Sequence, residues 1–203
     1  GLYHHWWDFS DAGKAALAEM SKRFQVELWV WVRPPLEFFR SSYVQMLKNP
    51  VGRVSCYGKD LSPDELLSDL WFARRLDYAG FVRDTAEVLG RDAVRPFVWR
   101  NSTVRDFLLA LGHGDLATQE PREHRTLGTV GAAMLRLVNA RAVANPVKAE
   151  AVRLVSQLDT AMGDASPEFE LDASTRARVA ALSGPGLAWL REEWNVDLGA
   201  MQS

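Results

Sequence analysis

The sequence predicts an α/β fold in which a parallel sheet with flanking helices is joined to a mainly helical C-terminal part. In residues 25–33, Val and Leu side chains alternate with Trp29 and Trp31, so both faces of this stretch are apolar. That pattern is typical of a central parallel strand covered by helices, and we expect both tryptophans in the core. Residues 94–99 form a second short apolar stretch, and helical patterns fill the segment between the two.

Local signals set the bounds of the helices. Ser62 to Glu65 is a capping box with proline at the first helical position, and Gly90 is expected to end the helix before it as a left-handed cap. Pro96 lacks the N–H that a ladder needs, so the second strand is expected at an edge or in an irregular ladder. Helices are expected from a cap at Asp8 or Ser10 to residue 24, and over residues 35–48, 62–71, 77–89, 102–111, 125–143, 147–162 and 174–194, the last interrupted at 183–186.

Composition narrows the function classes. The chain has 203 residues, 47% of them apolar and 25% charged, which suits one ordinary globular domain. A net charge of −2 argues against nucleic acid or an anionic membrane as a bulk partner, and no apolar run could span a bilayer. Cys56 is the only cysteine, and no His/Cys/Asp/Glu grouping has metal-ligand spacing. We therefore expect no metal, no membrane and a cytoplasmic setting, and the alternative is a processed fragment from another compartment.

An arginine and a serine form a candidate phosphate site. Arg33 directly follows the first predicted strand, and Ser41 lies about two turns into the next helix. Ligands of open α/β sheets gather at the carboxyl edge, where a guanidinium fork matches phosphate oxygens and a helix N-terminus adds a favourable dipole. The alternative is an arginine paired to an internal carboxylate and a serine that only fills space in a helix.

These residues resemble those of sulfotransferases that use 3′-phosphoadenosine-5′-phosphosulfate (PAPS). That family places an arginine at the end of a central strand and a serine eight residues later, usually trailed by tyrosine, as Arg33, Ser41 and Tyr43 stand here. Three later segments, residues 76–92, 94–98 and 104–112, resemble segments of bacterial sulfotransferase-like proteins. The similarity spans roughly residues 25–112 with the order of its pieces preserved, and that order is more specific than any single piece.

The resemblance implies a P-loop-type sheet in a single sulfotransferase-like domain over residues 1–203, with an α/β portion in 1–112 and a helical portion in 113–203. It implies that Arg33 and Ser41 hold the 3′-phosphate of PAPS. It also implies transfer of a sulfuryl group to a hydroxyl or amine of a small-molecule or carbohydrate acceptor, with no nucleic acid or membrane as partner.

One family element has no match. Sulfotransferases hold the 5′-phosphosulfate with a basic, glycine-rich loop near the N-terminus, and no such loop precedes Arg33. Either the first part of the protein, and with it part of the sheet, is absent from this chain, or sulfuryl transfer has been lost. Because the sequence begins without Met, we expect the former. The alternative is a non-catalytic module of the same fold that binds a nucleotide or a protein.

Four further residues are candidates for the site. Transfer requires a base to take the acceptor's proton, and His4 and His5 are the only histidines that precede Arg33. Arg122 and Arg125 lie in the general region from which the family closes a basic segment over the cofactor. For all four, the alternative is a solvated or crevice-lining segment without a catalytic role.

Overall fold

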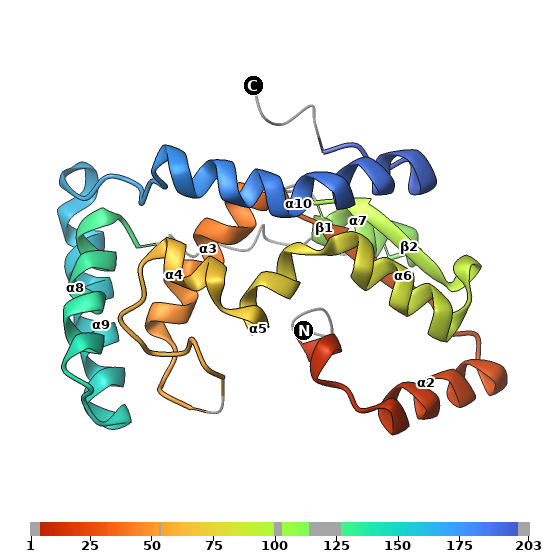
Figure 1. The fold of residues 1–203 in the computed structure, drawn as a ribbon, viewed down its shortest axis with the longest axis horizontal. Coiled ribbons are helices and arrows are strands. Elements are labelled where there is room, and N and C mark those ends of the chain that lie inside the picture. The colour runs from red at the N-terminus through yellow and green to blue at the C-terminus, as the bar shows by residue number, and fades with distance from the viewer. Residues whose placement is uncertain (1–4, 53, 100–102, 114–126, 199–203) are drawn as a thin grey trace. The chain divides into compact units, whose positions relative to one another are not determined.

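The computed structural model describes residues 5–52, 54–99, 103–113 and 127–198 (Figure 1). The chain divides into two compact units, and neither is a continuous stretch of sequence. The sheet unit comprises Gly1–Pro34, Asp77–Arg122 and Leu182–Ser203, and the helical unit comprises Pro35–Leu76 and Glu123–Ala181. Each unit is described by itself, because the positions of the parts relative to one another are not determined.

Two parallel strands organise the sheet unit. β1 (Leu28–Val32) pairs with β2 (Val94–Val98) from Leu28 opposite Val94 to Val32 opposite Val98. The unit's other elements are the helices α2 (Asp11–Arg23), α6 (Tyr78–Leu89) and α7 (Thr103–Ala110), the short turns η1 (Trp6–Asp8) and η3 (Arg91–Ala93), and the last part of α10 (Ala173–Trp194). The parallel α/β pairing expected from the sequence is confirmed, with a sheet of two strands in the described residues.

The position of Pro96 follows from the register. The Trp99 amide donates to the Val32 carbonyl at 2.8 Å, so alternate residues of β2 turn their backbone groups toward β1. Pro96 lies opposite Val30 with its nitrogen turned away from β1, and its missing N–H costs the ladder nothing. In the described residues no strand pairs with β2 on that side, which agrees with the expected edge position, and the ladder to β1 is regular.

The two faces of the strand pair are covered unequally. Val30, Val32 and Val94 are buried on the face that α6 covers, together with Phe81 and Val82 of that helix. The opposite face carries Trp29 and Trp31, and both stay partly exposed. The expectation that these tryptophans belong to the core is wrong, because only one face of the sheet receives a fully packed helix in the described part of the chain.

The predicted break in the last helix is also wrong, since α10 continues through Pro185. A proline inside a helix removes one hydrogen bond, here the one to the carbonyl of Ala181. Contacts within the sheet unit compensate this loss. Gly186 lies so close to α6 that an added Cβ would come within 3.3 Å of the Ala79 Cβ. Arg83 stacks over Trp189 with 4.4 Å between the guanidinium carbon and the ring centroid.

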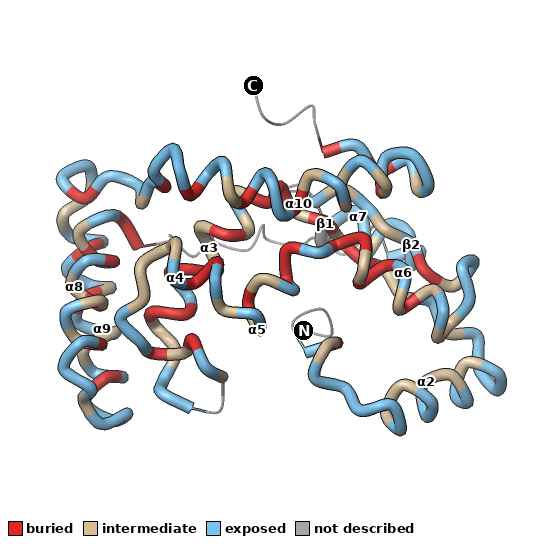
Figure 2. The backbone as a smooth tube through the Cα atoms, viewed as in Figure 1, coloured by how far each residue is buried: buried red, intermediate tan, exposed pale blue. Residues whose placement is uncertain are grey.

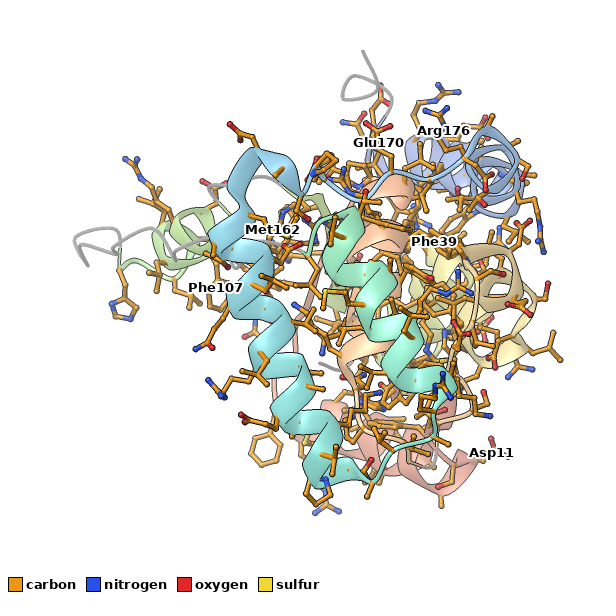
Figure 3. The ribbon with its side chains drawn as sticks, turned by 90° about the vertical axis from the view of Figure 1, so that its left-hand side faces the viewer. Asp11, Phe39, Phe107, Met162, Glu170 and Arg176 are labelled. Carbon is orange, nitrogen blue, oxygen red and sulfur yellow. The ribbon has the colours of Figure 1, made fainter. Side chains whose placement is uncertain are left out.

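The helical unit is built on α3 (Pro35–Lys48), α4 (Pro63–Ser68), α5 (Leu70–Ala73), the short turn η2 (Arg74–Leu76), α8 (Thr129–Ala140), α9 (Asn145–Met162), the short turn η4 (Gly163–Ala165) and the first part of α10. Its core joins Phe39 and Tyr43 of α3 to Leu135 of α8 and Val155 of α9. Buried stretches along the tube are coloured red in Figure 2. α8 and α9 lie side by side as a hairpin (Figure 3). The capping box at Ser62 is present as predicted.

A buried carboxylate joins α9 to the start of α8. The Asp159 side chain accepts hydrogen bonds from the backbone amides of Gly128 at 3.0 Å and Gly131 at 3.2 Å, and from the Ser166 hydroxyl at 2.5 Å. The cap position of α8 is Gly128, which has no side chain to cap with, so Asp159 supplies the missing acceptor. An added Cβ on Gly131 would lie 2.8 Å from that carboxylate, so the close approach requires glycine.

We expect Asp159→Ala to lower the free energy of unfolding by about 3 kcal/mol, because it leaves two buried amides without an acceptor. Urea unfolding followed by circular dichroism measures the loss. The matched control is Asp164→Ala, which removes an exposed carboxylate a few residues further along the chain. Equal effects of the two substitutions would contradict the capping role of Asp159.

Lys148 gives a second prediction. Its side chain is 2% exposed, and its Nζ has no hydrogen-bond partner in the described part of the chain. Desolvation by burial lowers the pKa of this amine from its usual value of 10.5. The unfolded chain therefore binds more protons than the folded one between the lowered pKa and 10.5, and this group makes stability rise with pH across that window.

We expect Lys148→Met to stabilise the protein by about 1 kcal/mol at neutral pH, because it removes a buried charge and keeps an apolar chain of similar length. Thermal unfolding over a pH series measures the advantage, which should shrink as pH approaches 10.5. Lys59→Met is the exposed control and should show no such trend. A loss of stability in Lys148→Met at neutral pH would show that the amine makes a favourable contact.

Candidate functional site

Arg33 and Trp99 stand together at the carboxyl edge of the strand pair. Each is the residue directly after its strand, and the bond from the Trp99 amide to the Val32 carbonyl continues the ladder up to them. The guanidinium carbon of Arg33 lies 5.8 Å from the centroid of the Trp99 ring. A fixed cation is thus held beside an aromatic ring at the edge where open α/β sheets bind ligands.

Tyr78 adds a neutral group to this edge. It begins α6 and is buried, and desolvation raises the pKa of its phenol far above the usual value, with the Arg33 charge opposing the shift. The phenol is therefore protonated at any physiological pH. The beginning of the helix is fixed by Asp77, whose side chain accepts from the Gly80 amide at 2.8 Å.

The predicted partner of Arg33 lies in the other unit. Ser41 is a half-buried residue of α3 in the helical unit, and Ser42 beside it is buried. Tyr43, the third residue of the sequence pattern, is a core residue whose hydroxyl donates to the Leu61 carbonyl at 2.9 Å, and burial raises its pKa to about 12. Since the units are not placed relative to one another, a clasp made of Arg33 and Ser41 stays a prediction.

The candidate catalytic histidines are only partly described. His5 is exposed directly before η1, and its Nδ1 lies 3.3 Å from an Asp8 carboxylate oxygen. A neighbouring carboxylate can orient an imidazole, so this local pair is compatible with proton transfer. His4, Arg122 and Arg125 lie outside the described residues, and their predicted roles are unchanged.

The helical unit contains a polar hollow of about 420 Å³ that the sequence did not indicate. Arg178 donates to the Asp64 carboxylate at 2.9 Å and to the Ser68 hydroxyl at 3.1 Å. The Ser55 hydroxyl donates to Asp69 at 2.5 Å, and Asp69 also caps α5. These carboxylates already cap a helix or pair with Arg178, so their presence around the hollow has a structural role and does not indicate a ligand site. No group of three or more metal-ligand side chains occurs in the described residues.

Sequence reasoning missed an aromatic surface on the sheet. Trp29 and Trp31 meet Phe97 of β2 and Phe107 of α7, with ring centroids 5.4–6.0 Å apart in each contact. Phe97 is 37% exposed and Phe107 is 36% exposed. The alternation of Trp29, Trp31 and Arg33 in the sequence was the available signal, because it assigns an arginine and two indoles to one face.

Comparisons of the chain with known protein families, with curated proteins and with solved structures found no match. No described helix is long and apolar enough to cross a membrane.

Proposed function

We propose that the sheet edge at Arg33 binds the 3′-phosphate of PAPS, and that the chain belongs to a sulfotransferase-like protein that transfers a sulfuryl group to a hydroxyl or amine of a small-molecule or carbohydrate acceptor. The observation that supports this best is the position of Arg33 directly after β1, at the carboxyl edge of a parallel pair and over the ring of Trp99.

The residues at this edge suit a nucleotide phosphate. The guanidinium is planar, so its N–H donors can meet phosphate oxygens in pairs, and the Trp99 ring lies 5.8 Å from its carbon. Tyr78 is buried near the Arg33 charge and supports this edge from within the unit, whereas Trp99 is 37% exposed and offers a ring face on which a base can stack. A cation and an indole together fit an anion attached to an aromatic ring.

Sulfuryl transfer places further demands on the protein. The acceptor oxygen or nitrogen forms a bond to sulfur while the bond from sulfur to the 5′-phosphate oxygen breaks, and the acceptor's proton passes to a base. His5, oriented by Asp8, is the described candidate for that base. No basic glycine-rich loop precedes Arg33 in the sequence, so transfer also needs a cradle for the 5′-phosphosulfate. A descendant that binds the nucleotide without catalysis is the alternative.

We expect Arg33→Gln to weaken binding of adenosine 3′,5′-bisphosphate by about 2 kcal/mol, or ~30-fold, since it removes a charge-assisted contact to phosphate. Isothermal titration calorimetry measures the change. Arg23→Gln is the matched control in the same unit, because Arg23 is exposed at the end of α2 and pairs with Glu19. Equal affinities of wild type and Arg33→Gln would remove the phosphate assignment.

Ser41 and Ser42 test the resemblance directly. We expect Ser41→Ala to reduce nucleotide affinity by about 1 kcal/mol through loss of one neutral hydrogen bond, while stability stays level. Combined with Arg33→Gln, it should cost less than the sum of the single changes, because both groups serve one phosphate. Ser42→Ala changes a buried position and should leave affinity intact. The reverse result, with affinity lost only in Ser42→Ala, would show that the eight-residue spacing is a coincidence.

A further inference from the structure

The aromatic surface on β1 and β2 borders a hollow of about 480 Å³ in the sheet unit. Trp29, Trp31 and Phe97 line it, and Asp106 of α7, Asn195 after α10 and Arg95 of β2 provide its polar groups. The volume lies within the range of small-molecule sites, which are mostly apolar with a few polar groups. This hollow is separate from the polar hollow of the helical unit.

The arrangement of the rings restricts what can bind. Trp31 and Phe97 are stacked with centroids 5.5 Å apart and an angle of 25° between their planes, and the Trp29 ring lies 6.0 Å from Trp31. Rings in direct contact leave no space between them for an organic ammonium ion, which aromatic cages surround. A stacked pair of this kind favours a flat ligand that adds another ring to the stack.

The charges around the hollow restrict the ligand further. Arg95 donates to a Glu27 carboxylate oxygen at 3.0 Å, and the other oxygen of Glu27 accepts from the Trp29 indole at 2.9 Å. The Arg95 charge is therefore matched by Glu27, and the pair fixes the orientation of Trp29. Among the described lining residues, Arg95 is the cationic side chain, and its pairing with Glu27 makes it a weak partner for an anionic ligand.

We propose that this hollow is a binding site for an uncharged planar aromatic molecule of about two fused rings, which packs against the stacked pair of Trp31 and Phe97 and turns a polar substituent toward Asp106 and Asn195. The site goes beyond the nucleotide proposal and does not depend on it. Arg33 follows Trp31 on the same face but does not line the hollow, so the two sites can be tested separately.

The test uses N-phenyl-1-naphthylamine, an uncharged aromatic probe whose fluorescence rises when it leaves water. We expect saturable binding to the full chain. Phe97→Leu and Trp31→Leu should each weaken binding about tenfold, because they keep apolar bulk and remove a stacking face. Phe24→Leu is the matched control, since Phe24 is a 65% exposed aromatic of the same unit away from the hollow. Thermal unfolding identifies any variant that has lost its fold, and Phe97→Leu, whose side chain is partly exposed, decides the result if Trp31→Leu does not fold.

Competition identifies the class of ligand. Naphthalene-2-carboxamide should displace the probe, whereas its decahydro analogue, which has the same skeleton without aromatic rings, should be at least tenfold weaker. The anionic probe 1-anilinonaphthalene-8-sulfonate should bind more weakly than the uncharged one. Equal probe binding by Phe97→Leu, Phe24→Leu and wild type, or equal competition by both carboxamides, would overturn the proposal. Arg33→Gln should leave probe binding unchanged even where nucleotide binding is lost, so failure of one site is distinguishable from failure of the other.

Discussion

The parallel register of β1 and β2 is the constraint on which the chemistry of the sheet unit depends. Val32 pairs with Val98, and its carbonyl accepts from the Trp99 amide, so the two strands end side by side. Arg33 and Trp99, the residues that follow, therefore lie together at the carboxyl edge. The same register places Trp31 opposite Phe97, one step earlier on the same face. The proposed anion site and the aromatic surface thus both depend on one set of backbone hydrogen bonds.

Features that depend on neighbouring residues could be predicted from the sequence. The capping box at Ser62 and the end of α6 at Gly90, which has φ of +93°, are decided within a few residues by hydrogen bonds and backbone freedom. The exposure of Trp29 and Trp31 could not be predicted in this way, because it depends on whether a distant element covers the second face. For Pro185, the local rule predicted a break, and contacts between α10 and α6 decided the outcome.

For the candidate site, too, the local feature could be predicted from the sequence and the long-range contact could not. The place of Arg33 at the strand end follows from the apolar pattern before it and from the strand that pairs with it. The meeting of Arg33 with Ser41 does not follow, because the chain passes from the sheet unit to the helical unit between them. Asp159 is a similar case. It caps the start of α8 by accepting from the amide of Gly128, 31 residues away in the sequence, and no local capping motif predicts this contact. Contacts between residues far apart in the sequence can be identified only once the fold is known.

A polar side chain at the end of an apolar strand also protects the register. Side chains alternate between faces, so a slip of one residue would move Trp29, Trp31 and Arg33 to the face that α6 covers. Arg33 would then carry a charge toward a core that now holds Val30, Val32 and Phe81, and burying an unpaired guanidinium costs several kcal/mol. Leu28 and its aliphatic neighbours would move to the exposed face in exchange. The aliphatic residues of β1 therefore suit the face that α6 covers, and the larger indoles suit the opposite face. The charge of Arg33 disfavours the reversed arrangement. The residue proposed to bind phosphate is thus also one that fixes the pairing on which its own position depends.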